Sequence, residues 1–375
     1  MSASLDEHLG YIADPLRLAR YEAAIDKTMH AGNSVADLGC GTGILGLLCL
    51  RAGASRVFAI DSTAMIEVAR QSLERAGWGD RAVFIHGKAH QVELPEKVDM
   101  VICDQVGYFG FDYGIVQSMQ DARRRFLKPG GCVVPSRILL KLAPVESESS
   151  HALAEGWQAK DIPAEFHWLR EYTVNSKHAV QLPREALLSA PADLGAIDFR
   201  NDNPDFHSWS VELRIERDGT LHGIAGWFEC ELAEDVWMTN SPIAEDAIKR
   251  PQAFFPIGEA VAVKAGDTIM ATVMARPADQ LIAWQVEIPA SGRKFSHSTW
   301  QGELLTSDAL GKHDPAHVPV PSRLGQARAC VLAYCDGRRT VLEIEQAVLR
   351  EHPDLLPSAA EISRFVAQVL GGDTL

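Results

Sequence analysis

The sequence predicts an α/β domain with a parallel sheet, followed by an antiparallel β barrel or sandwich and a small helical domain. Three observations predict this order. Strand-like and helical runs alternate over the first third of the chain, a glycine-rich turn joins the first of these strands to a helix, and short strands between turn residues replace the helical pattern after residue 135. A chain of 375 residues is long enough for two or three such domains.

The α/β domain is expected over residues 1–135. It begins with a helix near residues 14–30, where apolar positions recur at helical spacing after an Asp14-Pro15 start. The alternation that follows is typical of a parallel sheet with helices on both faces. The expected strands are 35–38, 56–60, 82–85, 99–103 and 132–134, and the expected helices are 43–52, 63–76 and 114–127.

The turn at residues 37–43 (DLGCGTG) indicates a cofactor that contains adenosine. Glycine adopts turn conformations that a Cβ would forbid, so the backbone can pass close under a ligand. Asp61 ends the next strand about twenty residues later, where a doubly wound sheet places an acid against ribose hydroxyls. The spacing is G-x-G-x-G rather than the dinucleotide pattern G-x-G-x-x-G, and the P-loop lysine is missing.

The second and third domains are expected at residues 136–303 and 304–375. Strand-like runs at 138–142, 209–215, 223–228 and 260–263 predict the antiparallel domain, and the polar, helix-compatible segment 147–175 is an insertion in it. Residues 313–321 (HDPAHVPVP) read as an extended linker. Three helical segments follow, at 329–334, 341–350 and 358–370, the second with Thr340 and Glu343 spaced for a capping box.

Composition narrows the function classes. A net charge of -14 argues against general binding to nucleic acid or to an anionic membrane. Seven scattered cysteines without a C-x-x-C pair suggest neither a disulfide framework nor a zinc site, and no metal is expected. The first residues lack a signal-peptide pattern and no run of eighteen apolar residues occurs, so the expected protein is soluble and cytoplasmic.

Motifs spread over about residues 8–300 resemble the protein arginine methyltransferases. The matching residues follow the family's order from its N-terminal segment through motif I and the hairpin loop to the barrel. They are His8, Asp14, Arg17, Tyr21, Ala24, Ile25, 39–45, 107–108, 127–131, 134–135, 241–242, 263–267 and 274–277. The resemblance implies a class I methyltransferase with a Rossmann-like domain and a β barrel, using S-adenosyl-L-methionine as cofactor.

The resemblance also implies a set of cofactor contacts. Arg17 would pair with the methionine carboxylate through its planar donors, although a helix charge at the surface is the alternative. His90 stands where the family has an acid near the adenine amine; a neutral imidazole can accept that hydrogen bond, or the histidine is simply exposed in a loop. The expected cofactor-binding residues are His8, Arg17, Asp37, Gly39, Gly41, Gly43, Ile44, Leu45, Asp61, Ser62, Ala89, His90 and Asp104.

The acceptor half departs from the family. In the family, the hairpin loop carries two glutamates that clamp a guanidinium. This chain has Asp104 and Tyr113 at those positions. We expect both to be catalytic: Asp104 takes a proton or positions the acceptor nitrogen, and Tyr113 hydrogen-bonds the same group. A second carboxylate is missing unless Asp112 swings into its space. Because a bidentate clamp needs fixed geometry, arginine is a doubtful acceptor.

The family's His-Trp element is also replaced, by Lys249 and Arg250. Two cations near the acceptor would repel a guanidinium and favour a carboxylate or another anionic group; alternatively they belong to a solvated loop. Tyr108 either lines the pocket or is core. The expected substrate-binding residues are Tyr108, Asp112, Lys249 and Arg250.

Residues 335–344 (CDGRRTVLEI) and the following helix resemble PqqD-like peptide-recognition domains. The resemblance implies a winged-helix unit in which residues 320–375 bind the leader of a ribosomally made peptide, usually by adding a strand to a small sheet. An Asp-Gly turn and a threonine cap such as Thr340 also occur before helices of many other kinds.

Together these features predict an S-adenosylmethionine-dependent methyltransferase of peptides or proteins, with N-methylation of a precursor peptide as the leading hypothesis. Methylation of a carboxylate or hydroxyl is an alternative, and a non-catalytic peptide-binding partner is another. The intact Arg17, glycine turn and Asp61 speak against the last, because a scaffold needs none of them.

The insertion at 147–175 suggests a homodimer. The family dimerises through an arm, and the aromatic residues here are typical of an interface, although they would also serve to cover the barrel of a monomer. The residues concerned are Trp157, Phe166, Trp168 and Leu169.

Overall fold

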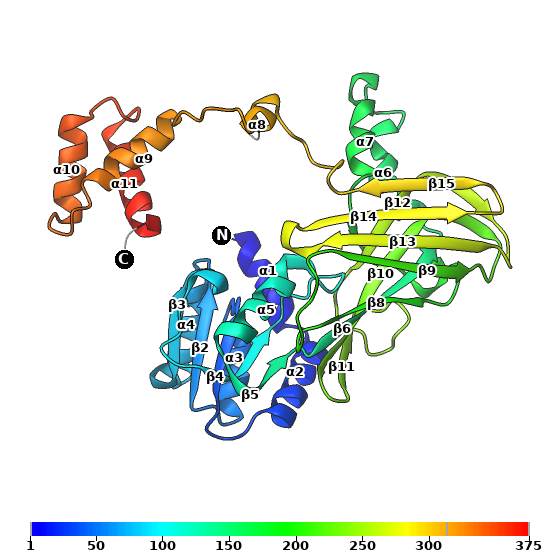
Figure 1. The fold of residues 1–375 in the computed structure, drawn as a ribbon, viewed down its shortest axis with the longest axis horizontal. Coiled ribbons are helices and arrows are strands. Elements are labelled where there is room, and N and C mark those ends of the chain that lie inside the picture. The colour runs from blue at the N-terminus through cyan, green and yellow to red at the C-terminus, as the bar shows by residue number, and fades with distance from the viewer. Residues whose placement is uncertain (1, 313, 374–375) are drawn as a thin grey trace. The chain divides into compact units, whose positions relative to one another are not determined.

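The structure, a computed structural model, describes residues 2–312 and 314–373. The chain divides into two units, Met1–Glu303 and Leu304–Leu375, and each is described by itself. Figure 1 labels most of the helices and strands of both.

Two helices precede the first sheet, α1 (Ser2–Ile12) and α2 (Pro15–Thr28). The second was expected, and it begins where the sequence indicated: the Asp14 side chain caps it by accepting from the Arg17 backbone N at 3.2 Å, with Pro15 in the first turn. The first helix was not predicted. Its apolar residues Leu5, Leu9 and Ile12 are exposed, so no buried stripe marks it in the sequence.

The parallel sheet has the strand order β3-β2-β1-β4-β5, and all five expected strands are present. The order reverses between β1 and β4, so a crevice opens beyond the carboxyl ends of these two strands. The strands are β1 (Ser34–Leu38), β2 (Arg56–Asp61), β3 (Ala82–His86), β4 (Val98–Cys103) and β5 (Leu127–Val134).

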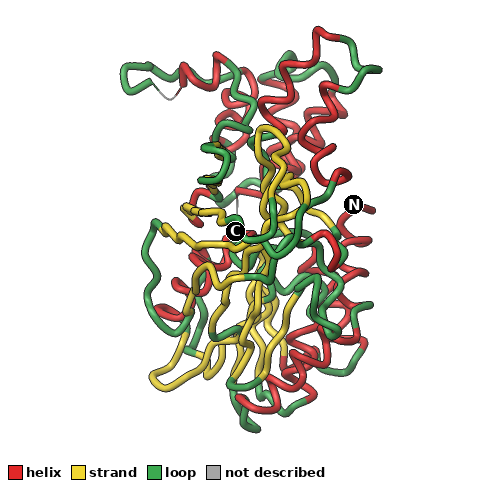
Figure 2. The backbone as a smooth tube through the Cα atoms, turned by 90° about the vertical axis from the view of Figure 1, so that its right-hand side faces the viewer, coloured by secondary structure: helices red, strands yellow, loops and turns green. Residues whose placement is uncertain are grey.

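The three expected helices connect these strands. They are α3 (Ile44–Arg51), α4 (Met65–Arg75) and α5 (Ile115–Arg125). The first packs on β1 and β2, the second on β2 and β3, and the third on β4 and β5. In Figure 2 the strands of the larger unit, in yellow, run together and the helices, in red, lie outside them.

After residue 135 the larger unit continues as two antiparallel sheets, ordered β7-β12-β10-β6-β8 with β11 beside β10, and β15-β14-β13-β9. Burial alternates along β14, which is typical of a strand with one face on a core. One core cluster includes Leu38, Phe228 and Trp284, so it joins the parallel and antiparallel parts into one unit. The strands are β6 (Arg137–Val145), β7 (His178–Val180), β8 (Ala192–Asp198), β9 (His207–Arg214), β10 (Gly219–Ala233), β11 (Val236–Thr239), β12 (Gln252–Val263), β13 (Thr268–Arg276), β14 (Leu281–Ile288) and β15 (Arg293–Ser298).

The segment 147–175 is helical, with α6 (Glu148–Glu155) and α7 (Arg170–Thr173) joined by short 3-10 turns. These helices project from the antiparallel region in Figure 1. Trp157, Phe166 and Trp168 are exposed on this arm, as residues 147–175 are called below. Tyr172, in contrast, is half-buried.

The smaller unit contains α8 (Ser307–Lys312), α9 (Arg323–Ala333), α10 (Val341–Glu351) and α11 (Ala359–Asp373). Val331, Ile344 and Val366 contribute to its own core. Thr340 and Glu343 form the expected capping box. Within 304–312 and 314–373, however, all regular structure is helical, so the small sheet expected for strand addition is not found there.

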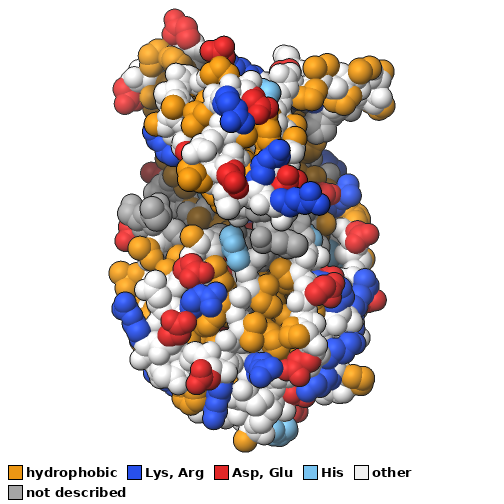
Figure 3. All heavy atoms as spheres, turned by 90° about the vertical axis from the view of Figure 1, so that its left-hand side faces the viewer, with side chains coloured by type: hydrophobic (Ala, Val, Ile, Leu, Met, Phe, Trp, Pro, Cys, Tyr) orange, Lys and Arg blue, Asp and Glu red, His pale blue; other side chains and the backbone are white. Residues whose placement is uncertain are grey.

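The surface agrees with an acidic, mixed composition. Figure 3 shows acidic and basic side chains interspersed with hydrophobic ones on one face. No helix in the described part of the chain combines the length and apolarity needed to cross a bilayer.

Candidate active site

Two adjacent cavities lie at the carboxyl ends of β1, β2 and β4. The first, of about 390 Å³, is lined by the glycine turn, by Asp61 and by His8 and Arg17 from the first two helices. The second, of about 520 Å³, shares Gly39 and Asp61 with the first. Together they are called the cofactor cavities below. Of the expected cofactor residues, they bring together His8, Arg17, Asp37, Gly39, Gly41, Ile44, Leu45, Asp61, Ser62, Ala89, His90 and Asp104.

The glycine turn can follow its path because Gly39 and Gly41 have φ of 63° and 52°, in the left-handed region. A Cβ on Gly39 would lie 2.5 Å from Gln105 Nε2, and one on Gly41 would lie 2.6 Å from His8 Cε1. Gly43 has another role, since it lines neither cavity and a Cβ there would meet Leu73 at 2.8 Å. Its place beneath a cofactor stays a prediction, and the structure shows that Gly43 lets the start of α3 pack closely against α4.

Asp61 is held in place from two sides. Its Oδ2 accepts the Gly41 backbone N–H at 2.9 Å, and its Oδ1 accepts the backbone N and the hydroxyl of Thr63 at 2.8 and 2.7 Å. These bonds fix the carboxylate at the end of β2, beside the turn. The arrangement fits a carboxylate that accepts hydrogen bonds from a ribose diol.

Asp104 lies at the centre of a buried charged cluster after β4. Its Oδ2 accepts from Arg17 Nε at 2.7 Å and from Arg250 Nη2 at 2.9 Å, and its Oδ1 accepts from the Tyr21 hydroxyl at 2.7 Å. Burial alone would raise the pKa of Asp104, but the charges of Arg250 and Arg17 outweigh it and hold the pKa below its usual range. The carboxylate stays ionised and is already bonded to three side chains.

Arg17 and Arg250 are both buried, at 3% and 7% exposure. Arg17 is therefore not a surface helix charge, and its Nη1 also donates to the Tyr11 carbonyl at 3.0 Å. Arg250 does not belong to a solvated loop either, because its Nη1 donates to the Gly107 carbonyl at 2.9 Å. Lys249 differs: its backbone N bonds Asp14 Oδ2 at 2.9 Å and its side chain is exposed.

A third cavity, of about 260 Å³, lies beside this cluster and is called the Arg250 cavity. Tyr113 lines it and both cofactor cavities, which makes it the residue of the hairpin loop shared by all three. Tyr113 has φ of 58° and is 53% exposed, and partial burial raises the pKa of its hydroxyl. The Arg250 cavity is lined by Glu7, Tyr11, Tyr108, Tyr113, Lys249 and Arg250, among others.

Asp112 is bonded within the hairpin loop and not in the space of the missing second carboxylate. Its Oδ2 accepts the backbone N–H groups of Tyr108 and Phe109 at 2.9 and 2.8 Å, and its Oδ1 forms an ion pair with Lys177. It lines none of the three cavities described above. The expectation that it swings into the acceptor space or binds substrate is not supported, because these bonds close the hairpin loop.

Tyr108 lines the Arg250 cavity and is half-buried, with the Lys177 ammonium 4.2 Å from its ring centroid. Burial raises the pKa of its hydroxyl to about 12. His90 is exposed at the edge of the second cofactor cavity. No hydrogen bond of the His90 side chain is seen in the described residues, so its contact with an adenine stays a prediction.

Comparison with known proteins finds similarity to methyltransferases over two parts of the chain. Residues 35–131 match the family model of a methyltransferase domain, and residues 142–288 match that of the arginine methyltransferase oligomerization subdomain. The probable protein arginine N-methyltransferase 6 of Arabidopsis thaliana is 29% identical over 60% of this chain and 54% of its own length. Protein arginine N-methyltransferase 1 of Schizosaccharomyces pombe is 26% identical over 72% of this chain and 82% of its own.

These matches show that the chain is similar to protein arginine methyltransferases. The fold agrees: the crystal structure of Arabidopsis thaliana protein arginine methyltransferase 10 superposes with a TM-score of 0.67 at 21% identity, covering 79% of this chain and 98% of that one. A Trypanosoma brucei enzyme–prozyme heterotetramer of protein arginine methyltransferase 1, solved with AdoHcy, also gives 0.67, at 18% identity over 78% of this chain and 96% of that one. The chain spans little more than half of the Arabidopsis methyltransferase 6.

The matched ranges end at residues 131 and 288, so the helical unit from residue 304 lies outside both. Within the larger unit, the sequence did not point to Glu7, Tyr11, Gln105 or Lys177. The first two sit four residues apart on α1, and the Tyr11 hydroxyl donates to Glu7 Oε1 at 2.6 Å. Lys177 is 65 residues from Asp112 in the chain, so no local sequence pattern predicts that the two residues pair.

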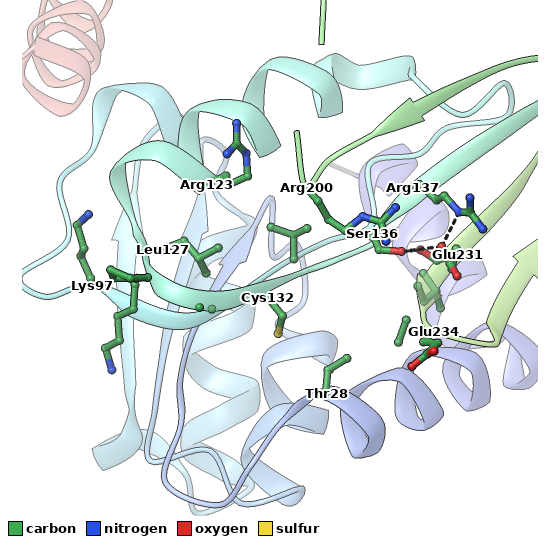
Figure 4. A pocket seen from close by; sticks show the side chains of 17 residues that line it. Thr28, Lys97, Arg123, Leu127, Cys132, Ser136, Arg137, Arg200, Glu231 and Glu234 are labelled. Carbon is green, nitrogen blue, oxygen red and sulfur yellow. Dashed lines mark hydrogen bonds and ion pairs between the residues drawn. The ribbon is translucent and has the colours of Figure 1, made fainter. Parts of the chain in front are cut away.

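A further cavity, of about 840 Å³, lies away from all these residues, along β5 and the hairpin of β10 and β11. In Figure 4 Ser136 and Arg137 turn toward Glu231, and Arg137 Nε donates to Glu231 Oε2 at 2.6 Å. The Arg200 guanidinium is also paired with a carboxylate, because its Nε and Nη2 each donate to Asp198 at 2.9 Å. None of the expected site residues lines this cavity, and we do not place the chemistry there.

Proposed function

We propose that the protein is an S-adenosyl-L-methionine-dependent methyltransferase that acts on a peptide or protein. The observation that carries the proposal is the arrangement of Gly39, Gly41, Asp61 and Arg17 around one cavity at the reversal of the parallel sheet. The similarity to named protein arginine N-methyltransferases supports the same activity.

The residues present fit this cofactor. Gly39 and Gly41 leave room where any side chain would collide, Asp61 offers a fixed acceptor to the ribose, and Arg17 offers guanidinium donors to the methionine carboxylate. Bound there, S-adenosylmethionine would supply an electrophilic methyl group: a nucleophile attacks the methyl carbon and the neutral sulfide is the leaving group, with no metal required. The protein contributes orientation and exclusion of water, the main sources of rate for such a displacement.

We test the cofactor site by calorimetry with S-adenosylhomocysteine, comparing Gly41→Ala with Gly32→Ala. Both glycines have positive φ, so both substitutions strain the backbone. Only Gly41 has a neighbour, His8, in the space of the new Cβ, whereas Gly32 has nothing within 4 Å. Gly41→Ala should weaken binding at least tenfold, about 1.4 kcal/mol, and Gly32→Ala should change it less than about twofold. A parent protein that does not bind would overturn the proposed function.

Arginine is the acceptor that the geometry supports least. Asp104 is bonded to Arg17, Arg250 and Tyr21, and Asp112 is bonded to Lys177 and to two backbone amides. Neither carboxylate is free to clamp a second guanidinium. The N-methylation that the sequence favours would need another nitrogen and a base to take its proton.

For the partner, we propose a ribosomally made precursor peptide whose leader binds the helical unit. The observation that supports it is a separate small unit with its own core and capping box, joined after a proline-rich segment. Because the described residues there are helical, the leader would lie against helices rather than extend a sheet. Mass spectrometry of peptides incubated with the protein and S-adenosylmethionine tests this, since modification independent of a leader would contradict it.

We also propose that the protein is a homodimer that pairs through the arm at 147–175. Its exposed aromatic side chains support the proposal, as does the match of residues 142–288 to an oligomerization subdomain.

A further inference from the structure

Arg250, a side chain of the protein itself, lies where a substrate guanidinium would be expected to bind Asp104. Its Nη2 lies 2.9 Å from Asp104 Oδ2, on the oxygen that also accepts from Arg17. A guanidinium arriving from a substrate would find this carboxylate already bonded to two guanidinium groups and a phenol. It would also meet the repulsion of Arg250 itself, strongest in a buried site.

The bonding of Arg250 is incomplete. Its Nη1 and Nη2 donate to Gly107 and Asp104, but its Nε–H is buried and has no partner among the described residues. A buried donor without an acceptor is costly, on the order of 1–3 kcal/mol. Only 8% of the Arg250 side chain is exposed, and the residue lines the Arg250 cavity. An anionic ligand that enters this cavity would bring a counter-charge to the Arg250 guanidinium.

The carboxylates around the cavity provide no buried base. Asp104 and Asp112 are held in ion pairs, and Glu7 lies exposed at the cavity, accepting from the Tyr11 hydroxyl. An amine acceptor must lose a proton before or during attack, whereas a carboxylate carries a free lone pair at neutral pH. The site is therefore better equipped for an acceptor that needs no deprotonation.

We infer that the Arg250 cavity binds a carboxylate of the peptide substrate and that the product is a methyl ester. This inference rests on the proposed function. One carboxylate oxygen forms the new O–CH₃ bond with its own lone pair, the C–S bond breaks, and its electron pair leaves with sulfur. The negative carboxylate and the positive sulfonium both become neutral, so no proton is released. Arg250 is a substrate-binding residue for this step, and Lys249 adds positive charge at the surface.

Binding tests the inference without turnover. The probes are N-acetyl-glutamate amide and N-acetyl-arginine amide, titrated by NMR into the full-length protein saturated with S-adenosylhomocysteine. We expect the acidic probe to bind at least tenfold more tightly, about 1.4 kcal/mol. Arg250→Met should abolish this preference and Arg250→Lys should retain part of it, because the charge remains.

Because a change at Arg250 threatens folding, Glu7→Gln provides a second variant at an exposed position. Removing this negative charge should strengthen binding of the acidic probe about two- to fivefold. Glu22→Gln is the matched control: it removes the same charge from an exposed position of α2 that lines none of the three cavities. If the acceptor were an amine, Glu7 would be needed as base or counter-charge. Glu7→Gln should then weaken substrate binding rather than strengthen it.

The outcomes are distinct. A protein that binds S-adenosylhomocysteine yet prefers the arginine probe, or fails to bind the acidic one, would overturn the carboxylate inference and leave the proposed function standing. So would a methylated peptide whose label survives alkali, because a methyl ester releases methanol under those conditions and an N-methyl group does not. Failure to bind S-adenosylhomocysteine would overturn the proposed function itself.

Discussion

Asp37, the acid that precedes the glycine turn, has only half of its carboxylate satisfied. Its Oδ2 accepts the Gly46 backbone N–H at 2.9 Å, and its buried Oδ1 has no partner among the described residues. Burial raises the pKa of Asp37 from its ordinary 3.8 to about 7, against the lowering effect of the Gly46 bond. Around neutral pH the side chain therefore gains or loses a proton in the folded protein.

This raised pKa predicts a pH-dependent stability. The folded protein holds a proton that the unfolded chain releases, so the stabilisation is complete below 3.8 and is lost as pH rises through about 7. Asp37→Asn removes the titration and keeps an oxygen for Gly46. The difference in free energy of unfolding, parent minus variant, should fall by about 2 kcal/mol between about pH 5 and about pH 8. Urea titrations without ligand measure it, and a difference independent of pH would contradict the assignment.

The site residues divide by what a local pattern can encode. The glycine turn and Asp61 were predicted from spacing alone, because strand, turn and acid recur at fixed distances in one βαβ unit. The pairing of Asp104 with Arg250 joins residues 146 apart. Sequence reasoning named both residues but treated them as separate influences on a substrate. Only the folded chain shows that each already satisfies the other.

The strands of the parallel sheet were predicted, whereas helix α1 and the strands β13 and β14, in which burial alternates, were not. The strands β1, β2 and β4 are almost wholly buried, so their apolar runs stand out in the sequence. Helix α1 instead reaches the site through His8 and Tyr11 while its apolar residues face outward. Its position depends on the close approach of His8 to Gly41, which no periodicity reveals.

The arm allows a matched test of the dimer. Trp168 on the arm and Trp300, beyond β15, are similarly exposed, at 54% and 56%. If the arm pairs two copies, burying an aromatic side chain there contributes about 1.5–3 kcal/mol, so Trp168→Ser should shift the protein toward monomer. Trp300→Ser should leave the dimer unchanged. Light scattering across a dilution series measures both, and a parent that is monomeric throughout would contradict the proposed dimer.

At the scale of the whole molecule, the two units have separate cores. The cluster of Val331, Ile344 and Val366 shares no residue with the cluster that joins the parallel and antiparallel sheets. Each unit can therefore be changed without removing the other's buried contacts. The composition shift and the proline-rich segment made this division predictable from sequence, whereas the absence of a sheet in the described part of the second unit was not.

This separation yields a prediction for a chain that ends at Glu303. It should bind S-adenosylhomocysteine as the parent does, because every residue of the cofactor cavities lies before the break. With a leader-containing peptide its KM should rise at least tenfold while kcat stays within about twofold, since a tethered leader raises only the effective concentration of the peptide. Steady-state kinetics on the peptide with and without its leader separate the two effects.

Val348→Asp in the full chain is the control, because a charge in the core of the helical unit should unfold that unit and reproduce the same KM. A truncated chain that discriminates leader-containing from leaderless peptide as the parent does would show that the helical unit does not recruit the substrate.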